Sequence, residues 1–411
     1  MRRTTCPIAL LFCFTFSLAV LSNLSQAQTF TALHTFTGAD GRLPQAPLTM
    51  DRAGNLYGTA SEGGLYEFGT AFKLSRRNGS YTYSVLHSFE GVYDGDGAYP
   101  SALVLAPDGT LYGSCGDGGQ YVQYGTIFRL QPPASICASI SCPWTETILY
   151  SFQGGIDQGG PGDIVFNAAG DIVGVTGDYG GVSGTVFEFT PAGSGWTYNL
   201  LYTFPSNGSA GQLPNSALVI DNAGNLYGTT LYGGTGGYGT VYQLTPSGSG
   251  WVHNLLYSFD RTMGAYPEGV ILDSTGNLFG ATAGGGSNNN SGGTLFELTS
   301  GSGGWTFNSF LTFTGLNQNT GPSAPLTMDS HGNLYGTTYG EGAYAYGNVF
   351  KLTPSRNGWI YTDLHDFTNY SDGANPDAQI ILDENGNLYG TASQGGNIHG
   401  GGYGTVWEIT P

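Results

Sequence analysis

The side chains with the most obvious chemistry are carboxylates and aromatic rings beside prolines. Asp163, Glu268 and Asp377 each follow closely after a proline that opens a β-like run. Tyr99 and Tyr266 stand directly before such a proline. Rings stack on the apolar faces of pyranoses, and carboxylates accept hydrogen bonds from hydroxyl groups. This set favours a sugar ligand, whereas two carboxyls across one opening would also suit glycoside cleavage.

Further acidic candidates lie in loops. They are Glu62, Asp117, Asp178 and Glu341 around Gly-Gly turns, and Asp96 and Asp372 in longer connections. Variable loops on a rigid scaffold commonly carry binding sites. The alternative is that Asp-Gly and Asn-Gly pairs only form turns.

One segment, Asp94-Gly-Asp96-Gly, has the spacing of a calcium loop but lacks the later bidentate Glu. No metal or other cofactor is therefore expected, and Ca²⁺ at Asp94 and Asp96 is the alternative.

Patterns typical of known catalytic sites are missing from the sequence. There is no Gly-x-Ser-x-Gly in a strand-to-helix context, no His-Glu-x-x-His and no paired Cys-x-x-Cys. We therefore expect a binding or scaffold module for an extracellular glycan or protein, rather than an enzyme. The competing hypothesis is an extracellular carbohydrate-active enzyme, a glycoside hydrolase or lyase, that uses two of Asp163, Glu268 and Asp377. A display role without any ligand stays open.

The composition predicts a Gly-punctuated β protein. Of 411 residues 70 are Gly, 13% are aromatic and only 10% are charged, which is unlike a disordered chain. The formal net charge of −18 would repel nucleic acids and anionic lipid headgroups. The expected state is a monomer.

Residues 1–27 resemble a secretory signal peptide. Arg2 and Arg3 precede an apolar run from Pro7 to Leu21, and Ser25-Gln26-Ala27 fits a cleavage site. The apolar run is shorter than the roughly 20 residues of a spanning helix, so an uncleaved anchor is the less favoured reading. The mature chain would begin near Gln28 and be secreted, to the periplasm, the cell surface or the medium.

Three cysteines remain after such a cleavage. Cys137 and Cys142 lie in one short insertion and are candidates for a local disulfide in an oxidising compartment. Cys115 has no obvious partner.

A repeat of about 55 residues organises everything after the signal. Its seven copies are marked by one glycine each: Gly58, Gly113, Gly174, Gly228, Gly280, Gly336 and Gly390. Each copy contains four short β-like runs, and no later segment has a sustained helical period. Residues 28–411 are therefore expected to form a single seven-bladed β-propeller of four-stranded antiparallel blades.

The two ends of the chain complete each other in this scheme. The last copy stops after its third run at Pro411, and residues 29–36 match the missing fourth run. An N-terminal strand that completes the last blade would close the ring and leave no long open edge. A stacked solenoid is the alternative, although it would need atypical terminal copies.

Two rings recur eight residues apart in six of the fourth runs, as in Trp196 and Phe204. An even offset predicts that both rings point to one face of the strand and pack against a neighbouring blade. His34, His87 and His365 occupy a slot that tyrosines fill elsewhere in this run, and are therefore expected to be structural. The recurring aspartates before the first turn of a copy, such as Asp51, are expected to bond nearby backbone amides.

The repeat resembles the bacterial GloVer tandem-repeat proteins, with the signature GxLYGTTxxGGxxGxGTVF. Here it reads GNLYGTTLYGGTGGYGTVY over residues 224–242. The resemblance implies a secreted propeller-like protein, often with a C-terminal surface-sorting signal, and implies no catalytic residues. The chain ends at Pro411 without such a tail, which argues against covalent anchoring.

Strand order decides which loops could bind. With the strands named A to D from the centre outward, the B–C and D–A connections share one face of the disc. These connections vary in length and chemistry. The A–B and C–D turns are short and uniform, except for the insertion that contains Cys137. We therefore expect any ligand site on the B–C and D–A face, near the mouth of the central channel.

Overall fold

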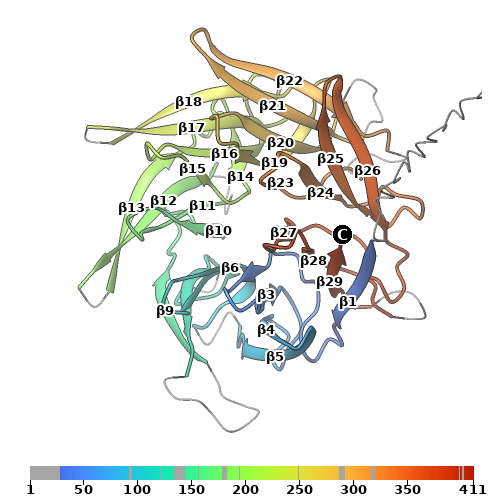
Figure 1. The fold of residues 1–411 in the computed structure, drawn as a ribbon. Coiled ribbons are helices and arrows are strands. Elements are labelled where there is room, and N and C mark those ends of the chain that lie inside the picture. The colour runs from blue at the N-terminus through green and yellow to red at the C-terminus, as the bar shows by residue number, and fades with distance from the viewer. Residues whose placement is uncertain are drawn as a thin grey trace, which may run out of the picture.

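The computed structural model describes residues 28–91, 95–121, 123–133, 144–155, 157–177, 183–193, 195–248, 250–286, 292–315, 320–397, 399 and 402–411. These residues form seven β-sheets arranged as the blades of one closed ring (Figure 1). The predicted all-β, seven-bladed propeller of four-stranded antiparallel blades is confirmed. Within the described ranges, no helix is long and apolar enough to cross a bilayer. Some of the predictions concern positions outside the described residues. These are the signal in residues 1–27, and Asp94, Cys137, Cys142 and Asp178.

The first six blades run from the inner strand outward in chain order. The first blade comprises β2 (Thr49–Met50), β3 (Leu56–Ala60), β4 (Thr70–Arg77) and β5 (Ser80–Ser88). The second comprises β6 (Ala98–Leu105), β7 (Leu111–Asp117), β8 (Thr126–Gln131) and β9 (Thr145–Ser151). The third comprises β10 (Pro161–Phe166), β11 (Ile172–Thr176), β12 (Thr185–Ala192) and β13 (Gly195–Thr203).

The fourth blade has its inner strand in two pieces, β14 (Gln212–Pro214) and β15 (Val219–Ile220), followed by β16 (Leu226–Tyr232), β17 (Thr240–Ser247) and β18 (Gly250–Ser258). The fifth comprises β19 (Ala265–Leu272), β20 (Leu278–Gly284), β21 (Thr294–Gly301) and β22 (Gly304–Thr312). The sixth comprises β23 (Thr327–Met328), β24 (Leu334–Thr338), β25 (Asn348–Ser355) and β26 (Gly358–Asp366). The seventh comprises β27 (Ile381–Leu382), β28 (Leu388–Ala392), β29 (Thr405–Thr410) and β1 (Thr29–Thr35).

The ring is closed by the N-terminal strand. β1 pairs antiparallel with β29, from Thr29 opposite Thr410 to Thr35 opposite Thr405 (Figure 1). Phe30 of this strand stacks on His365 of the sixth blade, with 3.8 Å between ring centroids. The seventh blade is thus made from both ends of the chain, as predicted.

The repeated glycine sits where a ring of the neighbouring strand leaves no room for a side chain. A Cβ atom at Gly58 would lie 2.6 Å from Cζ of Phe72, and one at Gly336 would lie 2.5 Å from Cζ of Phe350. The rings at the other five positions are Phe128, Phe187, Tyr242, Phe296 and Trp407. The glycine is therefore needed for close packing of the second strand on the third-strand ring in each blade.

The two rings of each outer strand do pack at blade junctions, but on opposite sides. Phe204, just after β13, packs on Tyr242 of the next blade with centroids 5.1 Å apart. Trp196, at the start of the outer strand, instead meets Tyr112 of the preceding blade at 5.8 Å. The prediction that both rings share one face is wrong, because the pairing of β12 with β13 shifts register between Val186 and Phe187. Such a bulge reverses the alternation of side chains along the strand.

The polar residues predicted to be structural have clear partners. Oδ1 of Asp51 accepts hydrogen bonds from the backbone N–H groups of Ala53 and Asn55, both at 2.9 Å, and closes the turn between β2 and β3. The three outer-strand histidines each face an aspartate of the following crossover, in the pairs His34–Asp40, His87–Asp96 and His365–Asp372, at 3.1 to 3.2 Å. Each histidine thus links the outer strand to the crossover that follows it.

Candidate binding site at the channel mouth

A proline positions the first side chains of each inner strand. Pro214 packs against Gly184 of the preceding blade so closely that a Cβ atom on this glycine would lie 2.5 Å from Cδ of the proline. Pro44 and Gly404 repeat the contact across the point of ring closure, also at 2.5 Å. Gly184 and Gly404 have φ values of 95° and 102°, a region in which side-chain-bearing residues are strained. Blade contact and backbone conformation together fix where the residue after each proline lies.

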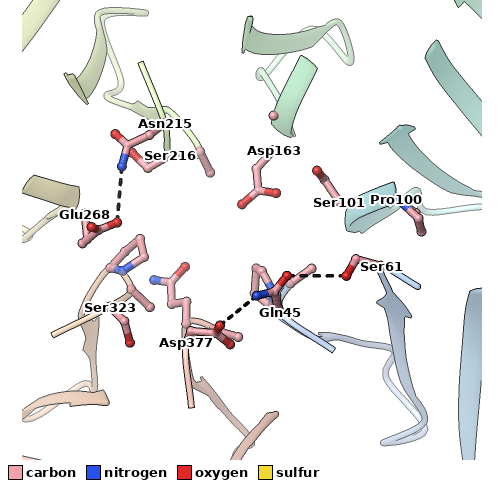
Figure 2. Close-up of a pocket in the computed structure, with 18 of the residues that line it drawn as sticks. Gln45, Ser61, Pro100, Ser101, Asp163, Asn215, Ser216, Glu268, Ser323 and Asp377 are labelled. Atoms are coloured by element: carbon pink, nitrogen blue, oxygen red, sulfur yellow. Dashed lines mark hydrogen bonds between the residues drawn. The ribbon is translucent and has the colours of Figure 1, made fainter. Parts of the chain in front are cut away.

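The residue after the proline faces the central channel in every blade. These seven residues are Gln45, Ser101, Gly162, Asn215, Glu268, Ser323 and Asp377. They line one cavity of about 360 Å³ together with their neighbours Asp163 and Ser216 (Figure 2). Segments that are far apart in the sequence thus contribute to a single site. The described residues that line it offer carboxyls, amides and hydroxyls but no Lys, Arg or His.

Glu268 and Asp377 are each held by an amide from a neighbouring blade. Asn215 donates a hydrogen bond through Nδ2 to Oε2 of Glu268 at 3.3 Å, and Gln45 donates through Nε2 to Oδ2 of Asp377 at 3.2 Å. Burial, with a contribution from the charge of Asp377, raises the pKa of Glu268 to about 8. Burial likewise raises the pKa of Asp377 to about 7, against the opposing effect of hydrogen bonds from Gln45 and Ser393. Both groups therefore carry protons for part of the time at neutral pH.

Asp163 completes the acidic set from β10. Its Oδ1 accepts a hydrogen bond from the backbone N–H of Ala102 at 3.2 Å, and burial raises its pKa. Figure 2 shows its carboxyl pointing into the same opening as those of Glu268 and Asp377. Three carboxyls thus face one cavity, and none of the described residues that line it is basic. This cavity therefore accepts and donates hydrogen bonds but does not attract anions.

The two candidate tyrosines take different places. Tyr99 lines the cavity and is 41% exposed, and its backbone has a φ of 57°. Tyr266 has the same strained backbone, at 60°, but packs on Tyr232 with centroids 5.4 Å apart and lies outside the cavity lining. The structure therefore brings Tyr99 to the acidic cavity and not Tyr266.

The loop candidates do not join this cavity. Glu62 forms an ion pair with Arg42 at 2.9 Å, and Asp117 ends β7 opposite Ala98. Glu341 is half-buried, accepts a hydrogen bond from Thr320 at 3.2 Å, and has its pKa raised by burial.

The two crossover candidates serve the loops that contain them. Besides the histidine contacts described above, Asp96 accepts a hydrogen bond from the backbone N–H of Glu90 at 2.8 Å, and Asp372 accepts one from Thr368 at 2.9 Å. Across the described residues, no cluster of three or more His, Cys, Asp or Glu side chains has a geometry suited to a metal ion.

Sequence reasoning missed the neutral members of the site. Gln45, Asn215 and Ser61 were not candidates, although Gln45 and Asn215 orient the two acids and Ser61 approaches Oε1 of Gln45 at 3.4 Å. Aligning the seven copies on the proline would have found the first two, because this single column contains Gln, Ser, Gly, Asn, Glu, Ser and Asp. Variation at one column of an otherwise regular repeat is the signal that was available.

Comparison with solved structures gives a similar fold at low identity. One similar chain, from B. thetaiotaomicron, is provisionally described as the extracellular domain of a hybrid two-component system. It is 13% identical with a TM-score of 0.51, and the match covers 93% of this chain and 41% of that one. Another is a provisionally assigned 6-phosphogluconolactonase of Bacteroides uniformis ATCC 8492, 13% identical with a TM-score of 0.50, covering 77% of this chain and 83% of that one. These likenesses show the propeller fold alone.

A comparison with curated proteins gave no match. The model of one protein family, the Gloeobacter/Verrucomicrobia repeat, matches residues 18–183 and 139–320, which together make up more than half of the chain. The chain belongs to this repeat family.

Proposed function

We propose that this member of the Gloeobacter/Verrucomicrobia repeat family is an exported binding module that holds a neutral sugar unit of a glycan at its channel mouth. The observation that carries the proposal is the cavity of about 360 Å³, whose described lining residues offer three carboxyls, several amides and hydroxyls, and no basic side chain. A volume of this size accommodates a small ligand. Export rests on the signal-like pattern of residues 1–27 and on the resemblance to secreted repeat proteins.

The protonation of the acids suits hydroxyl groups. A carboxyl with a pKa near neutrality donates one hydrogen bond and accepts others, which matches a sugar hydroxyl that does the same. Glu268 and Asp377, with pKa values of about 8 and about 7, are such groups. Tyr99 at the rim offers a ring face for the apolar side of a pyranose.

The same lining disfavours phosphorylated substrates. Phosphate recognition generally uses Arg, Lys or backbone N–H groups at a helix terminus. Among the described residues that line the cavity there is no Arg or Lys, and the carboxylates there would repel an anion. The activity of the 6-phosphogluconolactonase-like neighbour is therefore not proposed for this chain.

Hydrolysis of a glycoside is the second candidate. It is favoured by one observation, the raised pKa of Glu268, because a carboxyl protonated at neutral pH can serve as a general acid. The partner would be Asp163 or Asp377 in its ionised form. This candidate shares the cavity with the binding proposal and differs from it in the fate of the ligand.

The experiment is a glycan-array screen of the mature chain, followed by affinity and product measurements on any glycan that binds. Glu268→Ala removes the hydrogen-bonding carboxyl and should weaken binding about tenfold or more. Glu268→Gln keeps a neutral hydrogen-bonding group and should bind like the parent chain. Glu384→Gln, at an exposed site in the turn between β27 and β28, is the matched control.

Three outcomes are informative. Binding that is weakened by Glu268→Ala, without release of new reducing ends, supports the binding module. Release of reducing ends that is abolished by Glu268→Gln supports the hydrolase. Failure of every glycan to bind, or equal binding by the parent chain and Glu268→Ala, contradicts a glycan site at the channel mouth.

A further inference from the structure

A second feature lies at the blade junctions on the opposite face of the ring from the acidic cavity. At five junctions an aromatic ring of the second strand meets a ring at the start of the next blade's outer strand. The pairs are Tyr57–Trp144, Tyr112–Trp196, Tyr227–Trp305, Phe279–Trp359 and Tyr389–Tyr81, with centroids 5.8 to 6.3 Å apart and edge-to-face geometry. Such pairs stabilise a junction beyond the area that they bury.

The junction between the third and fourth blades lacks this pair. Val173 of β11 stands where the other blades have Tyr or Phe, while Trp251 of β18 keeps the facing ring. A cavity of about 620 Å³ opens here, lined by Phe166, Val173, Glu188, Asp221, Pro246 and Trp251 among others. At the junction of the sixth and seventh blades, Gln28 borders Tyr335 where a facing ring would lie, and a smaller cavity of about 110 Å³ is found. A cavity thus lies at each of the two junctions without the ring pair.

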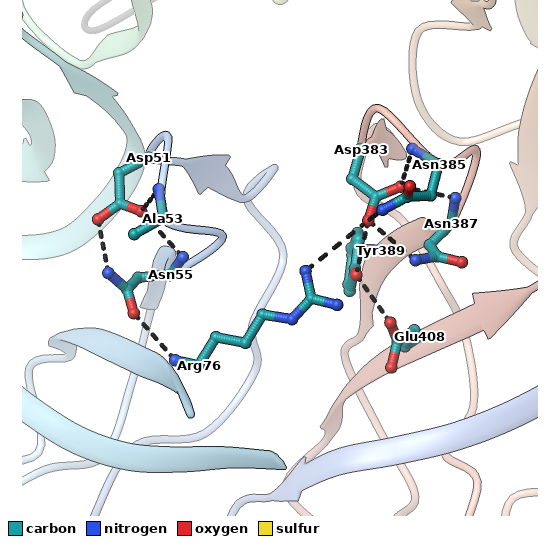
Figure 3. A network of polar contacts seen from close by, with 9 residues as sticks. All are labelled: Asp51, Ala53, Asn55, Arg76, Asp383, Asn385, Asn387, Tyr389 and Glu408. Atoms are coloured by element: carbon teal, nitrogen blue, oxygen red, sulfur yellow. Dashed lines mark hydrogen bonds and ion pairs between the residues drawn. The ribbon is translucent and has the colours of Figure 1, made fainter. Parts of the chain in front are cut away.

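The seventh blade shows what would fill the larger cavity. Tyr389 of β28 stands directly opposite Glu408 of β29 and donates a hydrogen bond through its hydroxyl to Oε1 at 2.7 Å (Figure 3). Val173 stands in the same way opposite Glu188 of β12. The junction therefore keeps Glu188 of the third blade and the facing Trp251 of the fourth, but has the smaller Val173 in place of the phenol ring between them.

The carboxylate of Glu188 is set to receive a donor. Asn167 donates a hydrogen bond through Nδ2 to its Oε1 at 3.3 Å, and Asn199 is a second hydrogen-bond partner of the carboxylate. Because a carboxylate has about four lone-pair sites, it can accept a further hydrogen bond. Burial, and then the nearby charge of Asp171, raise the pKa of Glu188. A neutral hydroxyl would donate this further hydrogen bond without adding a charge beside Glu188 and Asp171.

We propose that the junction between the third and fourth blades is a binding site for a neutral phenolic ring. The ring lies against Trp251 in the space that Val173 leaves open, and the phenol hydroxyl donates to Glu188. The site is separate from the channel mouth, and the proposal does not depend on the function proposed there. The ligand is either a small free phenol or the tyrosine side chain of a peptide, since both present the same group.

The test uses p-cresol, which has the ring and hydroxyl of a tyrosine side chain. Binding is measured by titration calorimetry and by intermolecular nuclear Overhauser effects to the indole of Trp251. A dissociation constant on the order of 1 mM is expected for a ligand with so few atoms. Toluene, which lacks the hydroxyl, should bind at least about tenfold more weakly, because the donor to Glu188 is missing. N-acetyltyrosine amide distinguishes the two sources: binding equal to that of p-cresol indicates that a peptide side chain can enter, and no binding indicates a small free phenol.

Variants decide whether the proposed site is the one used. Val173→Tyr restores the residue type of the other blades and should abolish p-cresol binding. Glu188→Ala should weaken binding about tenfold or more. Glu297→Ala changes the corresponding residue of the fifth blade, where Phe279 already fills the space, and should leave binding unchanged. The proposal is overturned if the parent chain does not bind p-cresol, if Val173→Tyr binds it equally well, or if no Overhauser effect reaches Trp251. The last measurement needs no variant and remains decisive if a substitution prevents folding.

Discussion

Replacement of Glu268 by Gln should remove a specific part of the pH dependence of stability. The folded chain holds this carboxyl at a pKa of about 8, above the usual 4.5, because burial and Asp377 disfavour its charged form. Between these two values the folded state binds more protons than the unfolded state. The stability that the protonated Glu268 carboxyl contributes is therefore fully present below about pH 4.5, and it is lost as the pH rises toward about 8.

The size of the effect follows from the same values. At about 1.4 kcal/mol for each pH unit, a carboxyl whose pKa rises from 4.5 to about 8 lowers the free energy of unfolding by at most about 5 kcal/mol between these limits. Water in the channel mouth reduces the cost of ionisation, so we expect about 2 to 4 kcal/mol. Gln has the same shape as Glu but does not ionise. In Glu268→Gln the free energy of unfolding should therefore no longer fall by this amount as the pH rises.

Urea unfolding at about pH 5 and about pH 9 gives the result. Each chain loses some free energy of unfolding between about pH 5 and about pH 9. This loss should be smaller in Glu268→Gln than in the parent chain by about 2 to 4 kcal/mol. The exposed Glu384→Gln should match the parent chain. If the parent chain and Glu268→Gln lose the same stability between the two pH values, the burial of this carboxyl is refuted.

Three further substitutions test the scaffold. Gly336→Ala should lower the free energy of unfolding by about 1 to 3 kcal/mol, because its Cβ would lie 2.5 Å from Cζ of Phe350. Gly303→Ala, with nothing within 4 Å of the new Cβ, is its control, and equal stability of both in urea would contradict the packing argument. Phe30→Ala should lower the free energy of unfolding by about 2 kcal/mol, because the half-buried ring no longer stacks on His365. An unchanged melting temperature would argue against ring closure by β1. Arg76→Ala removes the 4.0 Å ion pair to Asp383, which joins the first and seventh blades (Figure 3). Because the pair is partly exposed, this change should lower the free energy of unfolding by less than about 1 kcal/mol. A loss as large as that of Phe30→Ala would assign ring closure to the ion pair.

The blade number and ring closure were predictable because both are written into the order of residues. One glycine per copy counts the blades, and its invariance has a local cause in the ring that faces it, such as Phe72 at Gly58. The fourth-strand pattern at residues 29–36 identified the closing strand. These features depend on contacts within one blade or between neighbouring segments of sequence.

Features that depend on a break in regularity were not predictable in the same way. The bulge between Val186 and Phe187 turns the two rings of β13 to opposite junctions, and an even spacing of residues gives no sign of it. Val173 is visible as an irregular residue in the sequence, but the space beside it depends on Trp251, which comes from the next blade.

The candidate site was predicted in part. Tyr99, Asp163, Glu268 and Asp377 reach one cavity because each lies within two residues of the repeated proline, which recurs around the channel axis. Asp96 and Asp372 have the same chemistry but lie opposite His87 and His365 in the crossovers. Residue type alone does not separate a carboxylate that binds its own loop from one that faces a cavity.

The central claim is that acids from different blades meet at one channel mouth. Carbon-13 NMR titration of the glutamate side-chain carboxyls, with Glu268 assigned by its absence in Glu268→Gln, tests this claim most directly. The claim predicts a pKa of about 8 for Glu268 in the parent chain and a lower value in Asp377→Asn, because the charge of Asp377 contributes to the increase. A Glu268 carboxyl that titrates near 4.5 and does not respond to Asp377→Asn would contradict it.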